Sequence, residues 1–141
     1  MSDAPSGPPS APAGRPLVRA IDHFVLTVAD IEATIAFYTR ALGMEAETFA
    51  GGRRALRFGA QKINLHQAGA EFEPKAAWPV PGSADFCLLS DRPVAEIAAH
   101  LMREGVEVID GPVTRTGATG PLLSIYFRDP DGNLVEVANL A

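Results

Sequence analysis

The sequence predicts an α+β fold built from two βαβββ modules. Two observations predict it: the order strand, helix and three strands occurs twice along the chain, and a connection rich in proline separates the two runs. The modules span about residues 20–67 and 84–138, and we expect a single domain over residues 17–141. The connection, residues 68–83, is long for a small domain, and such a segment is often functional or links two halves.

The first module has clear start and stop signals. Residues 20–28 alternate and are rich in β-forming types, which predicts a strand. Asp30 offers a helix N-cap, apolar residues follow at helical spacing, and Gly43 ends the helix. Three strands separated by turns are then expected over residues 44–49, 54–58 and 62–67.

The second module repeats this order. A short strand covers residues 85–89, Pro93 opens a helix, and Gly105 closes it. We expect a strand over residues 106–109 and a polar, glycine-rich loop over residues 111–120. The last two strands, residues 122–127 and 134–137, are joined by the turn Asp129-Pro130-Asp131-Gly132-Asn133.

The composition of the chain predicts a disordered N-terminal tail and argues against a nucleic-acid-binding or membrane-spanning protein. Residues 1–16 are mostly Pro, Ala, Gly and Ser, which predicts a disordered tail. The net charge of −5 argues against a nucleic-acid partner, and no apolar run approaches the ~18 residues of a membrane span. The one cysteine, Cys87, permits no internal disulfide, so we expect a cytoplasmic protein.

Four strands carry polar residues where apolar ones are expected. The polar residues are His23 in the first strand, Asn64 and His66 on one face of the fourth, Asp85 at the start of the fifth, and Glu136 between two valines of the last. A buried carboxylate must be paired, neutralised or bound to metal, and histidine with carboxylate is the usual ligand set for first-row divalent metals.

Each residue also has a simpler interpretation. Taken singly, His23 fits a hydrogen-bonded strand histidine, and His66 fits an exposed residue where a strand meets a loop. Asp85 fits a turn cap, and Glu136 fits an edge strand facing water. Their joint occurrence in two matching modules favours the metal site.

Three segments together resemble the vicinal oxygen chelate superfamily. These are residues 21–31 (IDHFVLTVADI), residues 36–44 (AFYTRALGM) and residues 127–137 (FRDPDGNLVEV). The superfamily includes glyoxalase I, fosfomycin-resistance thiol transferases, extradiol dioxygenases and bleomycin-binding proteins. Residues 62–66, 71–77 and 114–118 resemble more closely the subgroup of glyoxalase domain-containing protein 5 and its bacterial, virulence-associated counterparts.

The resemblance implies a curved mixed sheet cup, the glyoxalase/bleomycin resistance fold, and a divalent metal ion (Ni, Zn, Mn, Co or Fe) bound by one residue from each of four strands. His23 and Glu136 match two of those positions. Asp85 stands where many members have histidine. Asn64 stands where glyoxalase I has glutamate, and His66 is the alternative ligand on that strand. Relatives also imply a homodimer, with modules from one chain or exchanged between two.

The function implied is a metal-dependent lyase or isomerase, similar to lactoylglutathione lyase, acting on a small oxygen-chelating substrate. Glu136 or His66 would move a proton between adjacent carbons. Asn64, Lys75 and Arg115 are the candidate substrate-binding residues, the last two in the long loops. An extradiol-type dioxygenase, a metal-dependent thiol transferase and a non-catalytic drug-binding protein are the alternatives. Phe72 and Trp78 could line the cavity, but we expect them to pack in the core.

Overall fold

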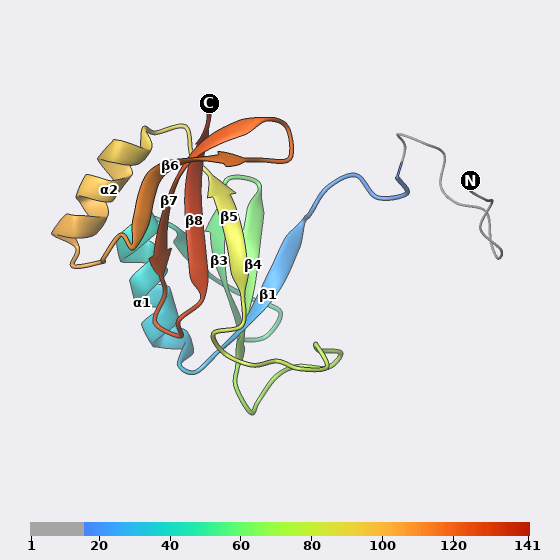
Figure 1. The fold of residues 1–141 in the computed structure, drawn as a ribbon. Helices are drawn as coiled ribbons and strands as arrows, with labels where there is room; N and C mark the ends of the chain where they lie inside the picture. Colours follow the sequence, from blue (N-terminus) through green and yellow to red (C-terminus); the bar gives the residue numbers. More distant parts are fainter. Residues whose placement is uncertain (1–15) are drawn as a thin grey trace.

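The computed structural model describes residues 16–141, and it confirms the two βαβββ modules (Figure 1). All but the last residue of the predicted tail lies outside the described residues. The first module consists of β1 (His23–Val28), α1 (Ile31–Leu42), β2 (Glu45–Phe49), β3 (Arg53–Phe58) and β4 (Gln61–Gln67). The second consists of β5 (Asp85–Leu89), α2 (Val94–Arg103), β6 (Asp110–Thr116), β7 (Pro121–Arg128) and β8 (Leu134–Leu140).

Helix α1 begins and ends where the sequence predicts. The Asp30 carboxylate accepts a hydrogen bond from the backbone N–H of Ala33 at 3.1 Å, which satisfies one of the free donors of the first turn. Gly43 has a φ of 68°, a left-handed conformation that suits glycine, and its N–H donates to the Thr39 carbonyl. Neither α1 nor α2 is long and apolar enough to cross a membrane.

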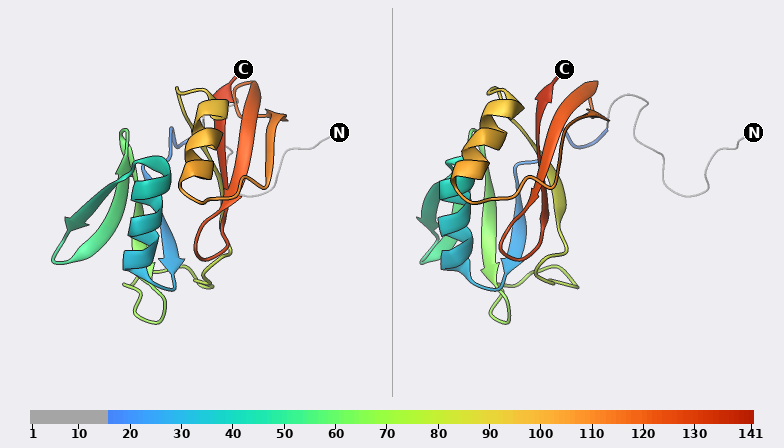
Figure 2. Two further views of the ribbon diagram at one scale, coloured as in Figure 1. Left: turned by 90° about the vertical axis from the view of Figure 1, so that its left-hand side faces the viewer. Right: turned by 60° about the vertical axis from the view of Figure 1, so that its left-hand side comes forward.

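Each module forms one four-stranded sheet, in the orders β1-β4-β3-β2 and β5-β8-β7-β6. The pairs β1–β4 and β5–β8 are parallel and the others are antiparallel. The two sheets meet near β1 and β5, where the rings of Phe24 and Phe86 lie 5.1 Å apart. Both helices lie on one side of the sheets (Figure 2).

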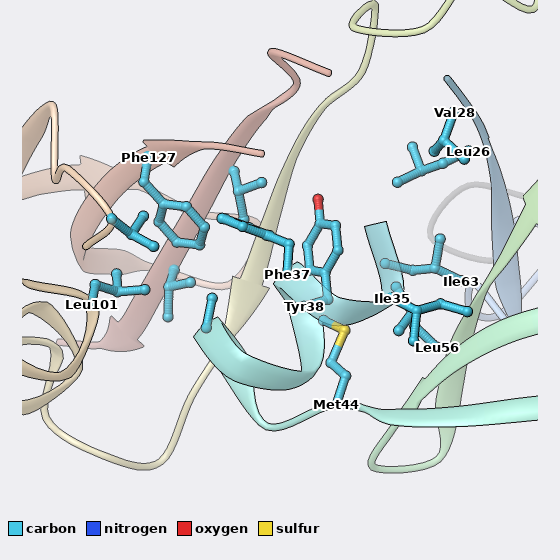
Figure 3. Packing of buried hydrophobic residues seen from close by; sticks show 14 of the residues in the cluster. Leu26, Val28, Ile35, Phe37, Tyr38, Met44, Leu56, Ile63, Leu101 and Phe127 are labelled. Carbon is cyan, nitrogen blue, oxygen red and sulfur yellow. The ribbon is translucent and has the colours of Figure 1, made fainter. Parts of the chain in front are cut away.

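The core lies between the helices and the sheets, and both modules contribute to it (Figure 3). Phe37 of α1 packs 6.1 Å from Phe127 of β7, ring centroid to ring centroid. In β1, Leu26 and Val28 are buried in this core, whereas Val25 is 42% exposed. Each sheet therefore has a covered face toward the helices and an open face away from them, which we call the helix-free face.

The prediction for residues 106–120 is wrong. The expected strand over residues 106–109 is not regular structure, and most of the expected loop is strand β6, Asp110–Thr116. Gly111 and Pro112 fit a strand here because β6 is the edge of its sheet and its pairing with β7 shifts register between Asp110 and Val113.

The turn after β7 ties the second module to α1. Asp129 is buried, and its Oδ1 accepts hydrogen bonds from the backbone N–H groups of Asp131 and Asn133. The other oxygen, Oδ2, accepts from the Tyr38 hydroxyl at 2.8 Å and from the Asn133 amide. Burial first, and then the Asp129 charge, raise the pKa of Tyr38, so this hydroxyl stays a proton donor.

Replacing Tyr38 by phenylalanine is therefore expected to lower the free energy of unfolding by about 1–3 kcal/mol, because the buried Asp129 carboxylate loses one donor. Urea denaturation followed by circular dichroism measures this difference. A loss below about 0.5 kcal/mol would mean that Asn133 and the turn backbone satisfy Asp129 without Tyr38.

Candidate functional site

The predicted site residues of the first module share its helix-free face. In the parallel ladder, Val25 lies opposite Asn64 and Thr27 opposite His66, so both polar residues of β4 face the same way as His23. His23 is exposed, and its Nδ1 pairs with the carboxylate of Asp22 at 2.8 Å. His66 and Asn64 are 3% and 6% exposed, so the interpretation of His66 as an exposed residue is wrong.

The predicted residues of the second module lie on its own helix-free face. Glu136 sits in the middle of β8, with Cys87 of β5 opposite on one side and Tyr126 of β7 on the other. Asp85 is two residues before Cys87 and therefore shares its face. Glu136 is half-buried in an interior strand, so the edge-strand interpretation of this residue is wrong.

The Glu136 charge contributes to raised pKa values of two neighbouring groups, the Cys87 thiol and the Tyr126 hydroxyl. Partial burial, then the Glu136 charge and a hydrogen bond to it, raise the pKa of the Cys87 thiol to about 11. Burial is also the main cause that raises the pKa of Tyr126, while Arg115 opposes it and Glu136 adds to it. At neutral pH both groups are therefore protonated, and they lie opposite Glu136 on the two neighbouring strands.

The two predicted substrate-binding cations are both paired with carboxylates. Arg115 lies on β6 rather than in a loop, donates to the Tyr126 hydroxyl at 3.0 Å, and pairs with Asp110 at 3.2 Å. Lys75 lies in the connection between the modules, as expected, and pairs with Glu73 at 3.2 Å. Through Tyr126, Arg115 joins the surroundings of Glu136, whereas Lys75 contacts its own loop.

Arg53 is a neighbour of His66 that sequence reasoning missed. Its Nη2 lies 3.3 Å from His66 Nε2, and an arginine can only donate, so Nε2 accepts and the His66 proton lies on Nδ1. Phe72, from the connection, lies against both groups: its ring is 5.7 Å from the His66 ring and 4.7 Å from the Arg53 Cζ. Phe72 and Trp78 are 47% and 85% exposed, so the expectation that they pack in the core is wrong.

Burial, and next the Arg53 charge, lower the pKa of His66 below its ordinary value. We expect Arg53→Gln to raise this pKa, because one of the two opposing influences is removed. The folded chain holds this proton more weakly than the unfolded chain, so stability should fall as the pH drops below about 6.5, and less steeply in the variant. NMR titration of the His66 ring protons gives both values, and equal pKa values would show that Arg53 does not act on this ring.

The side chain of Asn64 has an unusual environment. Its Oδ1 is buried and has no hydrogen-bond partner among the described residues. Such an acceptor is costly unless a ligand or an ion satisfies it. On the fourth strand, the Asn64 Oδ1 is thus free to bind a ligand or a metal ion. The Nε2 lone pair of His66 is already engaged by Arg53.

The described residues, 16–141, contain no group of three or more His, Cys, Asp or Glu side chains placed to hold a metal. The candidate ligands instead form two groups, His23 with Asn64 and His66 on one sheet, and Asp85 with Glu136 on the other. A groove of about 330 Å³ lies where the sheets meet, and its lining includes His23 and Cys87. The metal site itself stays a prediction.

The fold and these faces define the class: paired βαβββ modules with one polar, helix-free face each. The chain belongs to the Glyoxalase/Bleomycin resistance protein/Dioxygenase superfamily, whose family model matches residues 20–137. This confirms the resemblance found in the three sequence segments.

Two curated relatives are similar over most of the chain. Virulence protein STM3117 of Salmonella typhimurium is 54% identical over 122 residues, which are 86% of this chain and 85% of that protein. Its crystal structure superposes with a TM-score of 0.87 at 53% identity, over 89% of this chain and 99% of that one. Glyoxalase domain-containing protein RDO1 of Mycosarcoma maydis is 56% identical over 122 residues, 86% of this chain and 69% of that protein.

A more distant solved structure is a lactoylglutathione lyase from Agrobacterium tumefaciens. It is 26% identical, with a TM-score of 0.66, over 87% of this chain and 95% of that one. The family and the fold are therefore shown, and the reaction is not.

Proposed function

We propose that this protein is a metal-dependent lyase or isomerase whose site is completed by a second copy of the chain. The observation that supports it most is Glu136, a half-buried carboxylate on the helix-free face of β8, held between Cys87 and Tyr126. Its counterparts His23, Asn64 and His66 lie on the helix-free face of the other sheet. The substrate would be a small molecule with two neighbouring oxygens.

The donor atoms fit a divalent metal. His23 would supply a nitrogen, and Asp85 and Glu136 would supply carboxylate oxygens. The unpartnered Oδ1 of Asn64 supports this residue as the fourth donor, because a metal on His66 Nε2 would have to displace Arg53. This set suits Mn, Fe, Co, Ni or Zn, and such an ion, when bound, would act as a Lewis acid on the substrate oxygens.

The exposed apolar residues support a homodimer. Before β1, the chain extends away from the sheets (Figure 1), and Leu17, Val18 and Ile21 are 68–90% exposed. Val25, on the helix-free face itself, is 42% exposed. A second copy placed against these faces would cover this apolar surface and bring the first sheet of one chain to the second sheet of the other.

The chain's own residues would then handle the proton. Glu136 is the candidate base, because the Cys87 thiol and the Tyr126 hydroxyl on the neighbouring strands have raised pKa values and stay protonated. His66 is neutral at pH 7 and can accept a proton, although Arg53 must leave Nε2 for it to do so. This contact argues against the extradiol dioxygenase, in which His23, His66 and Glu136 would have to bind iron together.

The experiment that tests the proposal is metal analysis of the full chain, purified without chelator, combined with its mass in solution. We expect a dimer with one tightly bound divalent metal per chain, and recovery of that metal after chelation and reloading with Mn, Co, Ni or Zn. A dimer that binds none of these ions would instead support the drug-binding alternative. Redox-active iron as the resident metal would support the dioxygenase. The cytoplasmic location stays a prediction.

A further inference from the structure

Arg53 is a half-buried basic residue of the helix-free face without a carboxylate partner in the described part of the chain, whereas Arg128, which also lacks one there, is exposed and donates to the Gly132 carbonyl. Arg57, Lys62 and Arg115 each lie within 4.0 Å of a carboxylate oxygen. Among the described residues, no carboxylate lies within that distance of Arg53, although the chain carries a net charge of −5. A half-buried guanidinium without a counter-ion is poised to receive an anion.

We propose that Arg53 and Asn64 form a binding subsite for a small hydroxycarboxylate, with the ligand carboxylate on Arg53 and, in the metal-free chain, its hydroxyl on Asn64, whose Oδ1 would hold the ion in the loaded chain. This subsite rests on the proposed function, because it names the class of substrate that the same site would bind. Lys75 and Arg115, expected from the sequence to bind the substrate, are already engaged by Glu73 and Asp110.

The surroundings of Arg53 favour a carboxylate over a larger anion. Its Cζ lies 5.4 Å from the ring centroid of Phe49 and 4.7 Å from that of Phe72, so two rings limit access to the guanidinium. Nη2 is already committed to His66. The remaining N–H groups can bind the two oxygens of one planar carboxylate side by side, and the single guanidinium charge matches one carboxylate but not a doubly charged phosphate.

The hydroxyl follows from Asn64. Its Oδ1 is buried without a donor, and a ligand hydroxyl is a donor of the right size. Asn64 and His66 are two residues apart on β4 and face the same way, about 7 Å apart along the strand. Arg53 contacts His66, so the guanidinium and Asn64 lie on the same face of neighbouring strands, about one strand repeat apart.

The test is an NMR chemical-shift titration with lactate, with lactamide, propionate and inorganic phosphate as comparison probes. The full chain is used after chelation, where Asn64 Oδ1 is free for the hydroxyl, and the Arg53 comparison is repeated on the metal-loaded chain. Lactate should bind at least about tenfold more tightly than neutral lactamide, and more tightly than phosphate. Arg53→Gln should weaken lactate binding at least about tenfold and abolish the preference over lactamide, and Arg53→Lys should restore part of it. Asn64→Ala should instead remove the preference for lactate over propionate.

Arg57→Gln is the matched control, because Arg57 lies on the same strand and face but its charge is engaged by Glu47 at 2.6 Å. It should leave lactate affinity within about twofold. Unchanged binding in Arg53→Gln, or phosphate bound as tightly as lactate, would overturn the subsite. A monomeric Arg53→Gln variant would also overturn the subsite, because it would mean that Arg53 of the wild-type chain pairs with a carboxylate of the second copy. Metal content measured on the same samples tests the proposed function separately, because the Arg53 effect is expected in chelated protein as well.

Discussion

Replacing Glu136 by glutamine is expected to weaken metal binding by at least about 100-fold. The amide keeps the size of the side chain but removes the negative charge that would face the ion, and even partners outside the ligand shell are worth 10–100-fold in metal affinity. The fold should persist, because Glu136 lies on the helix-free face, away from the core, and glutamine has nearly the same size. Competition titration with a chromogenic chelator measures the affinity.

Glu47→Gln is the control for this effect. Glu47 is also a carboxylate on a helix-free face, but it pairs with Arg57 and Lys62 and is no candidate ligand. The Glu47→Gln variant should bind metal with the affinity of the wild-type chain. Equal metal affinity in Glu136→Gln and Glu47→Gln would remove Glu136 from the ligand set.

Gly111→Ala should destabilise the chain by about 3 kcal/mol or more, or prevent it from folding. A Cβ at Gly111 would lie 2.2 Å from the Ser124 carbonyl oxygen and 2.9 Å from the Ile125 Cα, and both atoms belong to the backbone of β7. The φ of 97° adds strain for any residue with a side chain. β6 cannot move away without losing its pairing with β7.

Gly51→Ala separates these two causes. Gly51 also has a positive φ, 78°, but a Cβ there meets no atom within 4 Å. Its alanine variant should therefore show the conformational cost alone, about 1–2 kcal/mol. Thermal and urea unfolding of both variants measure the difference. Similar stabilities for the two alanine variants would show that the approach of β6 to β7 is looser than described.

Local signals in the sequence were sufficient for most elements. The N-cap at Asp30, the left-handed Gly43 and the turn at residues 129–133 act through neighbouring backbone, so a single segment specifies each of them. β6 could not be predicted in this way. Gly111 and Pro112 indicate a loop in isolation, and only the position of β6 at a sheet edge makes them compatible with a strand.

The candidate site also combines features that one strand specifies with features that depend on several strands. Strand alternation placed Asn64 with His66 on one face and isolated Glu136 between two valines, because a residue's face follows from its parity. The neighbours that give these residues their properties, Arg53 and Tyr126, come from other strands, and their positions depend on register. Phe72 reaches Arg53 from a long loop, for which the sequence carries no comparable signal.

In the proposed dimer, His23 of one chain and Glu136 of the other bind the same metal ion. Mixing two variants, His23→Ala and Glu136→Gln, and isolating the heterodimer with two different affinity tags tests this pairing. A shared site predicts one tightly bound metal per heterodimer, because one of its two sites regains both residues while the other lacks both, and almost none in either homodimer. A heterodimer that binds metal as weakly as the two parent homodimers would contradict the shared site.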